Sequence, residues 1–69
     1  LNFMVVYEHF IKSDGYWFEV RQNQNGKFSI FNTERKKNPI NRDGIGYYVS
    51  CDPFDSLEEA KEYLNRLDA

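Results

Sequence analysis

Two side chains of this 69-residue sequence could take part in catalysis, the single histidine, His9, and the single cysteine, Cys51. A histidine changes charge near neutral pH and can act as a general base, and a cysteine thiolate is a nucleophile. Neither residue stands in a motif with the carboxylate, hydroxyl or second imidazole that such catalysis uses. We expect His9 to be a strand residue and Cys51 a small buried side chain at a strand end. The sequence therefore predicts that the protein is not an enzyme.

Two further patterns are typical of ion binding. Asp52, Asp55 and Glu58 recur at three-residue steps, but they lack the alternating ligands and central glycine of a calcium loop. Acidic residues in this position suit the start of a helix. Residues 43–46, Asp-Gly-Ile-Gly, could cradle a phosphate, but no lysine and helix follow them. We predict a loop end here, and no metal or cofactor.

The residues best suited to binding are cations interleaved with aromatic rings. Residues 21–42 hold six Lys or Arg and one Glu, a net charge of +5, in a chain whose total charge is −2. Cations beside stacking surfaces suit nucleic acid, and an aromatic patch edged by arginine is typical of a protein interface. A protein partner and a nucleic acid would both bind to the same set of residues. These predicted binding residues are Trp17, Arg21, Lys27, Phe31, Arg35, Lys36, Lys37 and Arg42.

A helix near the carboxyl end is expected to cover one face of a sheet. Ser56 and Glu59 are three residues apart, as in a capping box, directly before an amphipathic stretch. The stretch has one apolar stripe, which must be buried against another element. The stripe consists of Leu57, Ala60, Leu64 and Leu67. Because some fifty residues before the helix have the character of strands and turns, the opposite face of their sheet is left open.

The second of two expected hairpins joins strands at Tyr16–Asn23 and Lys27–Thr33. A three-residue loop with a bulge at Gly26 pairs Asn23 with Lys27 and gives each face a consistent character. The face toward the helix then carries Phe18, Val20, Phe28 and Ile30. The open face carries Trp17, Glu19, Arg21, Lys27, Ser29, Phe31 and Thr33.

The first hairpin joins a strand at Phe3–Ile11 to the strand that begins at Tyr16. A two-residue turn at Asp14-Gly15 sets Glu8 opposite Arg21 and places His9 on the helix-covered face. The alternative buries Glu8, which costs more free energy than burying histidine. We therefore expect the two-residue turn.

Residues 34–46 have no periodicity and are expected to form an exposed basic loop, followed by a short strand at Tyr47–Cys51. The sequence thus predicts a single α+β domain over residues 1–69. Its fold is an antiparallel meander of three or four strands with one carboxyl-terminal helix on one face (ββββα).

The cysteine count and the apolar runs indicate a cellular compartment, and Met4 indicates where the natural chain begins. One cysteine cannot form an internal disulfide, which favours the cytoplasm. No apolar run approaches the roughly 18 residues of a membrane-spanning helix, so we expect no membrane association. Because the fourth residue is Met4, residues 1–3 are interpreted as a remnant of cloning or of an upstream segment.

One family resemblance involves the strands with Trp17 to Arg21 and Gly26-Lys27, followed by Phe-Asp-Ser-Leu-Glu-Glu-Ala at residues 54–60. These features resemble the arm-site DNA-binding domains of phage and transposon tyrosine integrases, over roughly residues 16–69. The resemblance implies a three-stranded sheet with a carboxyl-terminal helix, whose open face enters the DNA major groove. By position it assigns DNA contacts to Arg21, Lys27, Ser29 and Thr33. The chain differs from that family in its extra first strand, its insertion at residues 34–46 and its acidic balance.

These observations lead to one functional expectation with an alternative. We expect a small non-catalytic accessory protein of a bacterium, phage or mobile element that binds a protein partner through its open sheet face and basic loop. The alternative is a DNA- or RNA-binding domain that uses the basic face of the second and third strands. Homodimerisation through the open face or an edge strand is a further option.

Overall fold

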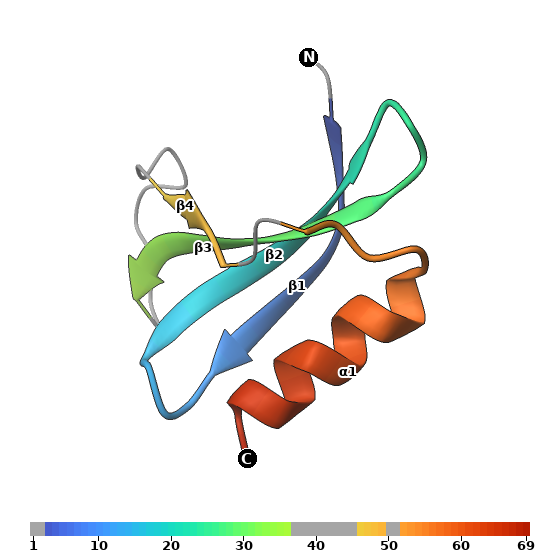
Figure 1. Ribbon diagram of the computed structural model, residues 1–69. Coiled ribbons are helices and arrows are strands. Elements are labelled where there is room, and N and C mark those ends of the chain that lie inside the picture. Colours follow the sequence, from blue (N-terminus) through green and yellow to red (C-terminus); the bar gives the residue numbers. More distant parts are fainter. Residues whose placement is uncertain (1–2, 37–45, 50–51) are drawn as a thin grey trace.

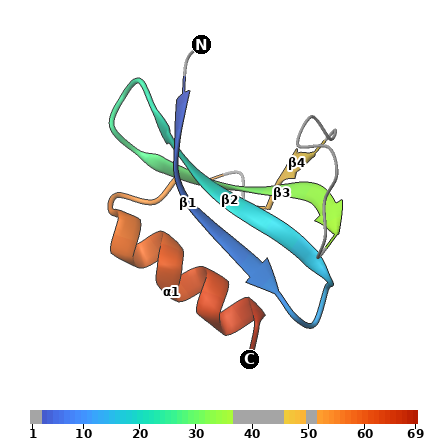
Figure 2. The same ribbon diagram turned by 180° about the vertical axis from the view of Figure 1, so that it is seen from behind.

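A four-stranded antiparallel sheet and one helix form the fold. The computed structural model describes residues 3–36, 46–49 and 52–69. The sheet has the order β1-β2-β3-β4, and α1 lies across one of its faces (Figures 1 and 2). The element bounds are β1 Phe3–Ile11, β2 Tyr16–Asn23, β3 Phe28–Lys36, β4 Tyr47–Tyr48 and α1 Leu57–Leu67. This arrangement confirms the predicted ββββα meander of the α+β class.

The core lies between the sheet and α1. Its buried apolar side chains are Ile11, Phe18, Val20, Ile30, Ala60 and Leu64. Of the predicted helix stripe, Ala60 and Leu64 are fully buried and Leu57 packs against the core. Leu67 is 37% exposed, so the stripe is buried only as far as the third turn. The predicted division of the sheet into a covered and an open face is confirmed by this core.

The start of α1 is capped as the sequence indicates, with one difference. Ser56 is the N-cap, and its hydroxyl oxygen accepts a hydrogen bond from the Glu59 N–H at 3.2 Å. The Glu59 carboxylate accepts from the Asp55 N–H at 3.1 Å, one residue before the position that a capping box uses. The segment before the helix is attached to the sheet, because Phe54 and Phe28 exchange main-chain hydrogen bonds.

The register of the second hairpin is the predicted one. Asn23 donates its N–H to the Lys27 carbonyl at 2.8 Å, and Val20 lies opposite Ile30. Gly26 has a φ of 84°, the left-handed conformation that glycine adopts without steric cost. The alternation of apolar and polar residues therefore sufficed to choose between two turn lengths.

The predicted register of the first hairpin is wrong by two residues. Ile11 lies opposite Tyr16 around a four-residue loop, in which the Gly15 N–H donates to the Ile11 carbonyl at 2.8 Å. Glu8 consequently faces Glu19 and not Arg21. Because side chains alternate with a period of two, this shift leaves Tyr7 to Ile11 on their expected faces. Before them, a bulge between Val5 and Tyr7 interrupts the alternation, and Val5 lies opposite Arg21 on the open face. His9 lies on the helix-covered side as predicted, although its partner on β2 is Phe18.

The third strand is longer than predicted, so residues 34–36 are not part of a loop. β3 continues to Lys36 by means of an irregularity beside β2, where Trp17 pairs with Arg35 and Phe18 with Asn32. Glu34, inside this bulge, has a φ of 60°. The bulge is secured by hydrogen bonds from the Glu34 N–H to the Asn32 side chain at 2.8 Å and from the Thr33 hydroxyl to the Trp17 carbonyl at 2.6 Å. The alternation of apolar and polar residues in the sequence does not reveal such a bulge.

The end of the sheet is only partly described. β4 covers Tyr47–Tyr48, the first two residues of the strand predicted at Tyr47–Cys51, and the Val49 N–H donates to the Ile30 carbonyl beyond it. Residues 37–45 of the predicted basic loop, with Lys37 and Arg42, lie outside the described residues, as does Cys51. Over residues 3–36, 46–49 and 52–69, no helix is long and apolar enough to cross a membrane.

Candidate functional site

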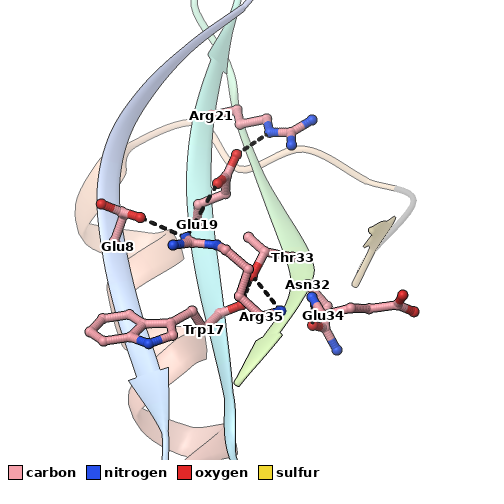
Figure 3. A network of polar contacts seen from close by, with 8 residues as sticks. All are labelled: Glu8, Trp17, Glu19, Arg21, Asn32, Thr33, Glu34 and Arg35. Atoms are coloured by element: carbon pink, nitrogen blue, oxygen red, sulfur yellow. Dashed lines mark hydrogen bonds and ion pairs between the residues drawn. The ribbon is translucent and has the colours of Figure 1, made fainter. Parts of the chain in front are cut away.

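The open face of the sheet carries a network of four charged side chains from three strands (Figure 3). We call Glu8, Glu19, Arg21 and Arg35 the open-face ion network. Arg35 donates to the Glu8 carboxylate at 2.7 Å, and its guanidinium lies 3.9 Å from the Glu19 carboxylate. The other Glu19 oxygen accepts from the Arg21 Nε at 2.5 Å. Two carboxylates and two guanidiniums therefore alternate across β1, β2 and β3.

Burial explains why these charges are paired. Arg35 is 5% exposed and Glu19 is 8% exposed, although both lie on the face that the helix does not cover. An unpaired charge at such a site would lose its hydration without compensation. The register of the first hairpin places Glu8 beside Glu19, and the two carboxylates would repel each other without Arg35. The β3 bulge leaves Arg35 on this face and places it opposite Trp17, where it supplies the neutralising cation.

Arg21 connects the ion network to an aromatic cluster. Its guanidinium carbon lies 3.5 Å from the centroid of the Phe31 ring and 4.3 Å from that of Phe3. A guanidinium over a ring face is attracted by the ring quadrupole. Phe31 in turn meets Tyr48 edge to face, with centroids 5.2 Å apart and an interplanar angle of 85°. This geometry holds the Arg21 side chain between two aromatic surfaces.

A second aromatic pair lies beyond the other end of the ion network. Phe10 and Trp17 are directly opposite each other on β1 and β2, with ring centroids 5.5 Å apart. Trp17 also lies opposite Arg35, next to the β3 bulge. The open face thus consists of a central charged strip with aromatic side chains at both ends. We call Phe3, Phe10, Trp17, Phe31 and Tyr48 the open-face aromatic residues.

The structure brings together half of the predicted binding residues. Trp17, Arg21 and Phe31 share the open face as expected, and Arg35 joins them. Arg35 was predicted to be an exposed loop cation, and this is wrong, because it is buried in the ion network. The Glu8 and Glu19 carboxylates already compensate the charge of Arg35 in the free protein.

The other predicted cations lie elsewhere or are not described. The Lys27 ammonium contacts the Asp55 carboxylate at 2.5 Å, in the segment that leads into α1. This hydrogen bond raises the pKa of Lys27 above its ordinary value of 10.5 and lowers the pKa of Asp55 below its ordinary value of 3.8. Lys36 is exposed at the end of β3, opposite Tyr16. Lys37 and Arg42 lie outside the described residues.

Sequence reasoning did not include Glu8, Phe10, Phe3 and Tyr48 in the site. A signal was present for Glu8 and Phe10, because they alternate with Tyr7, His9 and Ile11 and so belong to the open face. No local signal joined Glu8 to Arg35, which is 27 residues away. That contact depends on the register of one hairpin and the bulge of the other.

Metal binding and the position of His9 complete the description of the candidate site. Among the described residues, no group of three or more His, Cys, Asp or Glu could hold a metal ion. His9 lies on the covered face, with its Nε2 3.5 Å from the Asp68 carboxylate and its Nδ1 3.4 Å from the Tyr7 hydroxyl. Comparison with known proteins finds no matching family model, no matching curated protein and no matching solved structure.

Proposed function

We propose that this chain is a non-catalytic binding module that engages a protein partner through the open face of its sheet. The observation that carries the proposal is the arrangement of aromatic side chains around a charge-compensated centre. Trp, Tyr and Arg are the side chains that dominate binding energy in protein interfaces, and their surroundings must exclude water. Trp17, Tyr48 and Arg21 are of these types and lie on one face.

Charge compensation favours a protein over nucleic acid as the partner. A phosphate backbone is bound by cations that release counterions when they meet it. On the open face, Arg21 and Arg35 already pair with Glu19 and Glu8. A phosphate approaching either guanidinium would also meet a carboxylate, whereas an apolar protein surface with a few polar groups could cover this face without breaking the ion network.

Matched capture experiments test the protein-binding proposal. Immobilised wild-type chain, Trp17→Ala, Phe31→Ala and Glu62→Ala would be exposed to lysate of the cells that produce the chain, and captured proteins compared by mass spectrometry. Glu62 lies on the exposed side of α1 and is the control. We expect a set of proteins that binds the wild type and Glu62→Ala and is lost from both aromatic variants. Thermal unfolding of each variant checks that the fold is retained.

Equal capture by all variants would direct attention to nucleic-acid binding. If the wild type and the three variants capture the same set of proteins, the open face is not the protein-binding surface. Fluorescence anisotropy with duplex and single-stranded DNA and RNA then tests nucleic-acid binding, which the resemblance to integrase arm-site domains implies. A log affinity that falls with log salt, with a slope that Lys36→Ala and Lys37→Ala flatten, would favour a nucleic-acid role for the stretch that follows Arg35.

A further inference from the structure

The start of β1 is an exposed apolar segment at the edge of the sheet. Phe3, Met4 and Val5 are 36%, 59% and 41% exposed, and they are three of the six exposed large hydrophobic side chains in the described part of the chain. Figures 1 and 2 show this end of β1 extending past α1. Within the described residues, β2 is the only strand beside β1. The apolar side chains therefore coincide with an unpaired strand edge.

The register indicates which main-chain groups point away from the sheet. The Asn23 N–H donates to Lys27, so the main-chain groups of Asn23 face β3. Successive residues of an antiparallel strand alternate, so those of Gln22 face β1. Met4 lies directly opposite Gln22, and its main-chain groups accordingly face β2. The N–H and C=O groups of Phe3 and Val5 then point outward, where another strand can meet them.

This segment has no charge or proline to protect the strand edge, and its one protection is a bulge. Natural sheets discourage edge pairing with lysine, proline or inward-pointing charge. Phe3 to Tyr7 contains no charged residue and no proline, and the first charge of the strand is Glu8. The bulge between Val5 and Tyr7 interrupts the edge and limits regular pairing to Phe3–Val5. A strand that pairs here should be short, neutral and apolar on both faces.

We propose that Phe3–Val5 pairs antiparallel with the same segment of a second copy of this chain. Phe3–Val5 is itself short, neutral and apolar, as a strand that pairs with it should be. It is therefore complementary to the same segment of a second copy, which a twofold interface needs. A twofold axis at Met4 places Met4 beside Met4 of the partner subunit. It places Phe3 opposite Val5 of the partner subunit, so that residues with outward-facing main-chain groups exchange both hydrogen bonds.

This dimer has a structural consequence for the open face. In a continuous sheet, antiparallel edge strands are related by an axis perpendicular to the sheet, so both helices lie on one side. The two open faces then join into one surface on the other side. Because only three residues of each chain pair regularly, the interface is small and the dimer weak, with a dissociation constant between about 1 μM and 1 mM.

Sedimentation equilibrium of the full chain over this concentration range tests the proposal. We expect a monomer–dimer equilibrium for the wild type. Val5→Pro removes the outward N–H, which an edge strand tolerates, and should shift the equilibrium to monomer at every concentration. Val5→Ala is the matched control, because it shortens the side chain and keeps the N–H, and it should weaken the dimer by less than tenfold. A wild type that stays monomeric, a dimer that Val5→Pro retains, or open-ended association would overturn the proposal.

A crosslinking experiment provides a second test if Val5→Pro does not fold. In a Cys51→Ser background, Met4→Cys places two thiols beside each other across the twofold axis, and mild oxidation should give an intermolecular disulfide. Glu62→Cys, on the exposed side of α1, is the control. Crosslinking of Met4→Cys no greater than that of Glu62→Cys would contradict the pairing. Trp17→Ala should not change the equilibrium, which separates this dimer from binding through the open face.

Discussion

At the scale of residues, the open-face ion network shows how buried charges are accommodated. Arg35 lies between Glu8 and Glu19, and Arg21 occupies the other side of Glu19. Each cation is needed because a carboxylate beside it has lost part of its hydration. Arg21 has a second role, since its guanidinium also lies over aromatic rings. The network thus fixes the centre of the proposed binding face before a partner arrives.

Replacing Arg35 by methionine should destabilise the fold strongly. The change leaves Glu8 and Glu19 side by side without their shared cation, and we expect a loss of about 3 kcal/mol in the free energy of unfolding. Urea unfolding followed by tryptophan fluorescence measures it. The double variant Arg35→Met/Glu19→Gln should recover part of the loss, because it removes the more buried carboxylate. A single variant as stable as the wild type would show that the network contributes little.

The exposed pair of Lys27 and Asp55 should behave differently. Its hydrogen bond lowers the pKa of Asp55, so the pair stabilises the fold above the ordinary pKa of Asp55, and this stabilisation is lost as the pH falls through the lowered value. Lys27→Ala should return the pKa of Asp55 toward its ordinary value, as measured by NMR titration of the carboxyl carbon. Because both groups are exposed, salt screens the pair, and the unfolding midpoint should scarcely change. An unchanged Asp55 titration would argue against the contact.

At the scale of elements, α1 buries apolar side chains against the sheet over its first three turns. Its N-cap and apolar stripe follow the sequence pattern, but the stripe is not buried equally along its length. Leu64 is fully buried against the sheet, whereas Leu67, one turn later, is largely outside the core. Burial of a helix residue therefore depends on how far the sheet extends beneath it.

Two leucines of α1 provide a matched test of this difference. Leu64→Ala should lower the free energy of unfolding by about 2–5 kcal/mol, because it leaves a cavity between the helix and the sheet. Leu67→Ala removes the same atoms from a side chain that is 37% exposed, and it should cost less than half as much. Urea unfolding followed by circular dichroism measures both. Equal losses would mean that Leu67 is as buried as Leu64.

At the scale of the whole molecule, the first hairpin and the end of the helix hold each other in place. The Lys12 N–H donates to the Asp68 carboxylate at 2.8 Å, and the Ser13 hydroxyl donates to the Leu67 carbonyl at 3.3 Å. These contacts join residues more than fifty positions apart in the chain. They complement the exchange between Phe28 and Phe54 at the other end of the helix. The helix is thus anchored to the sheet at both ends.

Asp68→Ala should loosen only the carboxyl-terminal anchor. Loss of the hydrogen bond from Lys12 should lower the free energy of unfolding by about 1 kcal/mol. It should also speed hydrogen exchange at the Lys12 amide, as measured by NMR. Asp68→Asn keeps an oxygen acceptor and should retain most of the protection, which makes it the control. Equal exchange at Lys12 in the wild type and Asp68→Ala would show that the anchor does not form.

The sequence by itself determined the features that depend on short-range patterns. Alternation along the strands assigned Phe18 and Val20 to the covered face and Trp17 to the open face, and it selected the register around Gly26. The Ser56 cap and the leucine spacing located the helix. These inferences succeed because side-chain periodicity and capping act over a few residues.

Only the tertiary structure decided which charges meet. The faces of the first hairpin survive a two-residue slip, so the pattern could not distinguish Glu19 from Arg21 as the residue opposite Glu8. The position of Arg35 depends on a bulge whose hydrogen bonds come from Asn32 and Thr33 and whose backbone bends at Glu34. Pairing between Glu8 and Arg35 therefore results from two registers acting together, and no local propensity specifies it.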